Sequence, residues 1–251
     1  MRADRAPSLP KLGGMARPNG VVIVSERFWA FADVDGGVYE GELPARPRLA
    51  GRLPLVRGLF ALGSALAPLL RGRGVTRERD RVVLLLALLL PFAFVVLPSR
   101  LELVAGLLTT AALLLWLFRG RTLRLHGAEH RAIAAAEAGT LVATWHGTAR
   151  PTRFSPRCGT NFAELALPVT AGIDRLVPAS AAPVLTSLFV VGVSLGVAME
   201  LWKAVQHPSG LLRGLLLPGL ALQRLTTREP SPADTQVALR AVASVLRREL
   251  P

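Results

Sequence analysis

Two apolar runs in the middle of the chain predict a transmembrane hairpin. Residues 82–99 contain no charged side chain, and residues 101–118 contain only Glu102, at their edge. About 18 residues at a helical rise of about 1.5 Å give roughly 27 Å, close to the thickness of the hydrocarbon core of a bilayer. Arg100 and Glu102 indicate a tight turn between the two helices, and Pro91 indicates a kink in the first one.

A second pair of apolar stretches follows later in the chain. Residues 184–205 form a long apolar run, and residues 162–177 before it are apolar but interrupted by charges and a proline. If both cross, they form a second hairpin, so we expect four crossings, with three or five as alternatives. The segment 54–70 is broken by Arg57 and the segment 211–222 is short, so both predict helices at the membrane interface or re-entrant segments.

The two ends of the chain show different patterns. Residues 1–19 form a basic tail without the apolar core of a signal peptide. From residue 20 to residue 43, β-branched and aromatic runs flank the turn-rich stretch 33–37, which predicts a small β-hairpin or meander. Near the other end, apolar residues recur at helical spacing within 233–250 and predict an amphipathic helix.

These patterns predict a mainly α-helical polytopic membrane protein with a small N-terminal β-hairpin and a cytoplasmic helix-plus-strand insert. The predicted parts are a basic tail (1–19), a small β module (20–53), an interfacial helix with the first hairpin (54–118), a cytoplasmic insert (119–161), a second membrane hairpin (162–205) and C-terminal cytoplasmic helices (206–251).

Composition and charge support a membrane protein over a nucleic-acid-binding one. The chain is 51% hydrophobic and has a formal net charge of +13. The arginines cluster beside the apolar runs, where they meet anionic lipid and set topology, and no nucleic-acid-binding motif accompanies them. The basic loop 71–81, from Arg71 to Arg81, is therefore expected to contact anionic lipid. The positive-inside rule places this loop and residues 119–131 in the cytoplasm.

The candidate chemistry lies in the polar segment between the two hairpins. His126, Glu129 and His130 share one face of an alanine-rich helix that ends near Gly139. Two imidazoles one turn apart can bind one divalent metal ion, with zinc favoured, while a carboxylate beside them acts as ligand or base. The order H-x-x-E-H is that of inverted zinc peptidases. Glu137, two turns further on, is a second candidate base, and histidines that only form hydrogen bonds are the alternative.

Three other residues are candidates for the same site. Cys158, the only cysteine, excludes an intrachain disulfide and is either a thiolate ligand or a small buried residue. Glu200 lies in an apolar helix, where a carboxylate is costly in lipid, so it either completes a His/His/Glu site or pairs with Lys203. His146, in a β-like stretch at 140–148, is interpreted as an exposed histidine.

Several short motifs, taken together in this order, resemble one known family. The motifs are His126-Gly-Ala-Glu-His-Arg131, Glu137-Ala-Gly139, Pro156-Arg-Cys-Gly-Thr160 and Leu222-Gln-Arg-Leu-Thr-Thr-Arg-Glu-Pro230. The chain resembles the YqhQ-like family of bacterial membrane proteins (domain of unknown function 1385), which are predicted to be metal-dependent enzymes. The resemblance implies a location in the bacterial cytoplasmic membrane. It also implies a histidine where this chain has Ser155, which indicates a divergent member.

The sequence therefore predicts a metal-dependent, hydrolytic membrane protein whose substrate the residues do not specify. The alternative is a non-catalytic membrane scaffold or sensor that binds anionic lipid or a partner protein through the basic loop and the β module. A transporter ranks last, because the two cleanest apolar runs offer few polar side chains beyond Thr109 and Thr110.

Overall fold

The structure is a computed structural model that describes residues 9–45, 47, 52–71, 74–178, 182–206 and 211–250. Parts of the predicted segments lie outside these residues: 1–8 of the basic tail, 46 and 48–51 of the β module, 72–73 of the basic loop, 179–181 of the second hairpin, and 207–210 and 251 of the C-terminal segment.

The N-terminal region forms a four-stranded antiparallel sheet with the strands in sequence order. Its strands are β1 (Gly13–Arg17), β2 (Gly20–Val24), β3 (Phe28–Asp33) and β4 (Val38–Glu42). The meander that the pattern allowed is therefore confirmed. The predicted tail boundary is wrong, because β1 lies within 1–19 and pairs along its whole length with β2, from Gly13 opposite Val24 to Arg17 opposite Gly20.

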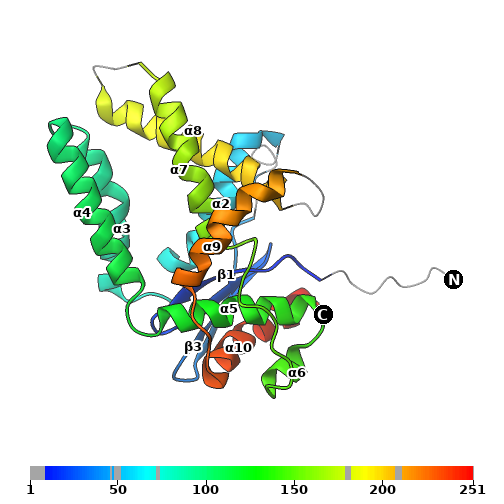
Figure 1. Ribbon diagram of the computed structural model, residues 1–251. Coiled ribbons are helices and arrows are strands. Elements are labelled where there is room, and N and C mark those ends of the chain that lie inside the picture. The colour runs from blue at the N-terminus through cyan, green and yellow to red at the C-terminus, as the bar shows by residue number, and fades with distance from the viewer. Residues whose placement is uncertain are drawn as a thin grey trace.

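The rest of the described chain is mostly helical (Figure 1). The helices are α2 (Pro54–Arg71), α3 (Glu78–Phe94), α4 (Ser99–Leu117), α5 (Thr122–Glu137), α6 (Leu141–Trp145), α7 (Gly159–Leu176), α8 (Pro183–Val205), η1 (Leu211–Leu216), α9 (Leu217–Thr226) and α10 (Pro232–Glu249).

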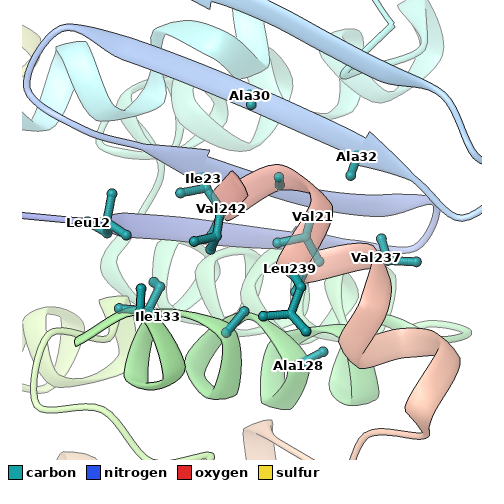
Figure 2. Close-up of a cluster of buried hydrophobic side chains, with 14 of the residues drawn as sticks. Leu12, Val21, Ile23, Ala30, Ala32, Ala128, Ile133, Val237, Leu239 and Val242 are labelled. Atoms are coloured by element: carbon teal, nitrogen blue, oxygen red, sulfur yellow. The ribbon is translucent and has the colours of Figure 1, made fainter. Parts of the chain in front are cut away.

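One buried core joins the sheet to α5 and α10. Because side chains alternate along a strand, β2 and β3 direct Val21, Ile23, Ala30 and Ala32 toward these two helices, as Figure 2 shows. From the helices, the labelled residues Ala128, Ile133, Val237, Leu239 and Val242 meet them. This core is therefore assembled from three segments that lie far apart in the sequence: the N-terminal sheet, α5 and α10.

The opposite face of the sheet is also buried, which explains why β2 is apolar throughout. Val22, Val24, Trp29 and Phe31 pack there with Val75. The predicted amphipathic C-terminal helix is confirmed as α10, whose Val237, Ala241 and Val245 are all buried.

Among the described residues, two helices are long enough and apolar enough to cross a membrane: α4 and α8. No residue of the apolar window of α4 is buried within the molecule, whereas 28% of that of α8 is buried. The single span predicted at 82–99 is wrong in its extent, since α3 ends at Phe94. Pro98 disfavours helix at the residue before it, so the chain turns there. Arg100 and Glu102 consequently lie in the first turns of α4 rather than in the connection.

The remaining apolar helices pack with each other. α7 and α8 form a hairpin, and α8 also packs along α2. Two glycines permit the close approach of α2 and α8: a Cβ on Gly58 would lie 2.9 Å from Met199 Cβ, and one on Gly196 would lie 3.0 Å from Leu55 Cβ. In Figure 1 the α3–α4 hairpin stands beside this group, and its turn, the end of α7 and the start of α8 lie on the side away from the sheet.

The strand predicted at 140–148 is wrong, because this segment folds as the short helix α6. Val142 and Trp145, which suggested a strand, are exposed and face no sheet. The backbone groups are satisfied locally instead, with Thr144 N–H donating to Thr140 O and Thr148 N–H to Ala143 O. Gly147, at φ +75°, ends the turn.

A buried carboxylate ties the start of α10 to the start of α5. Asp234 accepts hydrogen bonds from Ser231 in a capping box, from Arg121 Nη2 at 2.6 Å and from Arg124 Nε at 3.2 Å. Burial alone would raise the pKa of Asp234, but the hydrogen bonds from Ser231 and Arg121 outweigh it and hold the pKa below its ordinary value.

We expect Asp234→Ala to lower the free energy of unfolding by about 2–3 kcal/mol, because it removes a helix cap and leaves two arginines without their partner. Since the pKa of Asp234 is depressed, its contribution is complete above the ordinary aspartate pKa of about 3.9 and disappears as the pH falls through the lower native value. Thermal unfolding of detergent-purified protein at pH 7 and pH 3 checks this. Asp35→Asn, at an exposed turn position, is the control, and an equal difference between wild type and Asp234→Ala at both pH values contradicts the assignment.

Candidate metal centre

His126 and His130 lie one turn apart on α5, and both rings are oriented by backbone carbonyl groups. His126 Nδ1–H donates to Thr226 O at 2.8 Å, and His130 Nδ1–H donates to Arg153 O at 2.7 Å. A carbonyl oxygen can only accept, so in each neutral ring the proton lies on Nδ1 and the lone pair lies on Nε2. Metal-binding histidines donate their other ring N–H to a carbonyl oxygen in the same way.

The two imidazole rings lie close together near Cys158. The ring centroids are 4.5 Å apart in an edge-to-face arrangement. His126 Nε2 lies 3.2 Å from Cys158 Sγ. His130 is 2% exposed, and its Nε2 has no hydrogen-bond partner among the described residues. A buried nitrogen lone pair without a partner is unfavourable unless something binds it.

Cys158 supplies the third donor from the N-cap position of α7. Its Sγ lies 2.8 Å from Thr160 Oγ1 and accepts a hydrogen bond from Thr160 N–H. The N-terminus of a helix favours negative charge, which suits a thiolate. The side chain is 5% exposed, so the sulfur faces the two imidazoles rather than solvent.

The loop before Cys158 is held by two fully buried amides. Gln223 Oε1 accepts from Ser155 N–H at 2.9 Å, and Gln223 Nε2 donates to Ser155 O at 2.7 Å. Asn161 Nδ2 donates to Ser155 O and Pro156 O. These bonds fix the backbone from which Cys158 projects.

The His126, His130 and Cys158 ligand atoms all lie within 4.8 Å of one another. Ligand atoms on a tetrahedral zinc ion lie roughly 3.3–3.7 Å apart, given bond lengths of about 2.0–2.3 Å. Small side-chain adjustments therefore bring the three atoms to a common ion. Two imidazole nitrogens and a thiolate form a donor set that suits zinc, so the residues present fit the divalent ion expected from the sequence.

Residues 226–230, which we call the strap, cross α5 beside the two histidines. Thr226 O accepts from His126, and Arg228 N–H donates to Leu123 O at 2.8 Å. The crossing requires the glycine of the histidine motif, because a Cβ on Gly127 would lie 2.2 Å from Arg228 O.

Ion pairs connect the strap to two other segments of the protein, which contain Arg131 and Arg153. Glu229 binds Arg131 at 2.7 Å and Arg153 at 3.6 Å. Arg153 also donates to Thr227 O at 2.8 Å. Both carbonyl groups that orient the histidines, Thr226 O and Arg153 O, therefore belong to segments fixed by this network.

The two predicted bases occupy different places. Glu129 is buried against β1, where a Cβ on Gly14 would lie 2.8 Å from its Cγ. Burial raises the pKa of Glu129 to about 7, and the nearby His126 opposes this rise. Glu137 is partly exposed and forms an ion pair with Arg157.

Other predicted residues lie outside the cluster. Glu200 was expected either to complete the site or to pair with Lys203, and it is not among the three clustered donors. Its carboxylate binds Lys203, with Nζ at 3.1 Å, and also Arg57, with Nε at 3.0 Å. His146 is exposed at the end of α6, as expected. Of the described part of the basic loop, Arg77 is exposed at the start of α3.

A cavity of about 1060 Å³ opens beside His130. α5 contributes His130, Ile133, Ala134 and Glu137 to one wall, and the ends of α2 and α8 contribute Arg57, Glu200, Lys203, Ala204 and Gln206 to another. Residues 152 and 154–157, together with Lys11 and Glu26, complete the lining. The cavity thus joins the predicted histidine site to Glu137, Ser155 and Glu200, three of the residues that the cluster leaves out.

Sequence reasoning missed the residues that position the donors. Gln223, Asn161 and Arg153 are ordinary polar residues whose importance lies in contacts with distant segments. One signal was present: Gln223 and the strap both fall within the segment 222–230, which already carried the family resemblance.

The fold and the site define a mostly helical chain that has a His/His/Cys cluster, with His130 and Cys158 buried, and two helices long and apolar enough to cross a membrane. Residues 82–248 match the family described as Protein of unknown function (DUF1385), and the chain belongs to this family. It is similar to Uncharacterized protein YqhQ of Bacillus subtilis (strain 168), with 31% identity over 133 residues, which cover 51% of this chain and 42% of that protein. The matched region thus spans less than half of the relative's length. No solved structure matches the chain.

Gly127→Ala should displace the strap, because the added methyl group meets backbone rather than a flexible side chain. We expect a loss of about 1–3 kcal/mol in the free energy of unfolding, as for overpacked sites. Cys158 should also react faster with a thiol reagent, since Thr226 no longer holds His126 against it; as the only cysteine, it gives an unambiguous signal. Gly172→Ala is the control, because a Cβ there meets nothing within 4 Å. Unchanged stability and reactivity in Gly127→Ala would show that the strap does not support the site.

Proposed function

We propose that this protein is a metal-dependent hydrolytic enzyme of the cytoplasmic membrane, with one divalent ion, zinc, held by His126, His130 and Cys158. The observation that carries the proposal is that one donor atom each from His126, His130 and Cys158 lies within 4.8 Å of the others, while both Nδ1–H groups are held by carbonyl oxygens. His130 Nε2 is buried without a hydrogen-bond partner among the described residues, an arrangement that a purely structural histidine does not need.

Three protein donors leave one position of a tetrahedral ion for another molecule, as in catalytic rather than structural zinc sites. When bound, such an ion acts as a Lewis acid on a carbonyl or phosphoryl oxygen. The chain's own residues do the rest: Thr226 O and Arg153 O orient the imidazoles, and Thr160 supports the sulfur. Of the two candidate bases, Glu137 shares the cavity with His130 and is the one placed to exchange a proton with a molecule there.

We also propose that α3–α4 and α7–α8 are two membrane hairpins, with the sheet, α5 and α10 in the cytoplasm. α4 exposes apolar side chains on every side, and α8 is apolar enough to span. Basic residues follow the positive-inside rule in this orientation: Arg77, Arg119, Arg121 and Arg124 lie at the ends nearest the sheet. The α3–α4 turn, the end of α7 and the start of α8 lie away from it (Figure 1).

Detergent-purified protein should contain about one zinc ion per chain by elemental analysis. The variant His126→Ala/His130→Ala should contain none, because one remaining donor does not hold the ion, and Cys158→Ser should bind more weakly. His146→Ala removes an exposed histidine and should leave the metal content unchanged.

Metal content that is unchanged in the double variant would refute the site. Absence of metal in the wild type, together with binding to vesicles of anionic lipid, would favour the non-catalytic scaffold instead.

The topology can be tested with single cysteines in a Cys158→Ser background. In intact spheroplasts, a membrane-impermeant maleimide should label Leu97→Cys and Leu176→Cys, which lie at the outer ends of the two hairpins, but not Val142→Cys in α6. All three positions are exposed, so all three should be labelled after lysis. Labelling of Val142→Cys in intact spheroplasts would show that the orientation is the opposite of the one proposed.

A further inference from the structure

The cavity beside His130 lies between α5 and the ends of α2 and α8. Its first wall is α5, which is fixed to the sheet, and its second wall consists of the first turn of α2 and the last turns of α8. If α8 spans a bilayer, residues at its end lie at the level of lipid headgroups. A molecule in the cavity can therefore touch His130 while part of it remains in the bilayer.

The polar groups on the wall favour an acceptor-rich, negatively charged ligand. Four cationic side chains line the cavity, against three carboxylates: the cations are Lys11, Arg57, Arg157 and Lys203, and the carboxylates are Glu26, Glu137 and Glu200. The single carboxylate of Glu200 binds two of these cations, with Arg57 Nε at 3.0 Å and Lys203 Nζ at 3.1 Å. These three side chains together therefore carry a net positive charge.

Two residues that line the cavity each have a buried nitrogen atom without a partner among the described residues. One is His130 Nε2, and the other is Gln206 Nε2 at the end of α8. An amide N–H group buried without an acceptor is unfavourable, and a phosphate oxygen would satisfy it. Apolar side chains stand beside these groups, including Ile133, Phe154 and Ala204, so the cavity suits a headgroup with an apolar continuation.

We propose that the cavity binds the phosphate-bearing headgroup of an anionic membrane lipid and presents it to the His126/His130/Cys158 centre. This inference names the substrate class of the proposed enzyme and rests on that proposed function. Arg57 and Lys203 hold the phosphate, Gln206 donates to one of its oxygens, and the acyl chains pass along α2 and α8 into the bilayer.

The test uses the full-length protein in a neutral detergent. Thermal unfolding is followed while short-chain phosphatidylglycerol, phosphatidylcholine of the same chain length, or glycerol 3-phosphate is added. We expect a saturable rise in melting temperature with phosphatidylglycerol, because a ligand that binds only the native state stabilises it, and no such rise with phosphatidylcholine. Glycerol 3-phosphate should bind more weakly. If it binds as tightly as the lipid, the ligand is a soluble phosphate and the lipid assignment fails.

Variants locate the site. Lys203→Gln should weaken phosphatidylglycerol binding by about tenfold, the usual effect of losing a hydrogen bond to a charged group, and Lys203→Arg should restore it. Arg175→Gln removes an exposed charge from the far end of α7 and should bind like the wild type. If Lys203→Gln does not fold, Lys11→Gln, at an exposed lining position, serves in its place. Equal binding by Arg175→Gln and the cavity variants would overturn the proposal.

Metal content measured in the same samples separates this inference from the proposed function. Zinc retained in Lys203→Gln together with weakened lipid binding supports both. Zinc bound by a wild type that does not respond to phosphatidylglycerol leaves the metal centre standing and overturns the lipid assignment. A wild type that binds phosphatidylglycerol without zinc would mean that the cavity is a lipid site and that the metal centre is wrong.

Discussion

Two hydrogen bonds from imidazole to backbone determine what the centre of this molecule can do. Each histidine of the α5 pair gives its Nδ1 proton to a carbonyl oxygen, and this fixes both the tautomer and the direction of the remaining lone pair. Without these bonds the rings could rotate, and two histidines one turn apart would be ordinary polar residues on an alanine-rich helix. With them, His126 Nε2 lies beside the sulfur at the N-cap of α7, and His130 Nε2 is left without a hydrogen-bond partner among the described residues.

The carbonyl groups that accept these protons come from distant parts of the chain, so the whole fold takes part in orienting the rings. Thr226 O lies in the strap that crosses α5 over Gly127, and Arg153 O lies in the connection after α6. α5 itself is held by the sheet on one side and by α10 through Asp234. The centre is therefore assembled only when the first fifty residues, the middle segment and the last twenty have come together.

The pattern of apolar and polar residues predicted helices and strands correctly where it was compatible with only one kind of element. The apolar periodicity of α10, the glycine that ends α5 and the β-branched runs of the sheet all led to the structures observed. The pattern failed in two places. The segment 140–148 pairs with no strand among the described residues and folds as a helix, and the apolar run 82–99 outlasts its helix, because α3 ends at Phe94 before Pro98. For the site, spacing brought His126 and His130 together because helical geometry is local. Cys158 could only be a candidate, and Gln223 and Asn161 carried no pattern, since their contacts bridge segments about sixty residues apart.

The two walls of the cavity belong to different packing groups. α5 packs against the sheet, whereas α8 packs closely against α2 at Gly58 and Gly196. In the membrane orientation proposed above, a change in the tilt of α8 would move Lys203 relative to His130 on α5. The thickness of the bilayer would then act mechanically on the opening of the cavity.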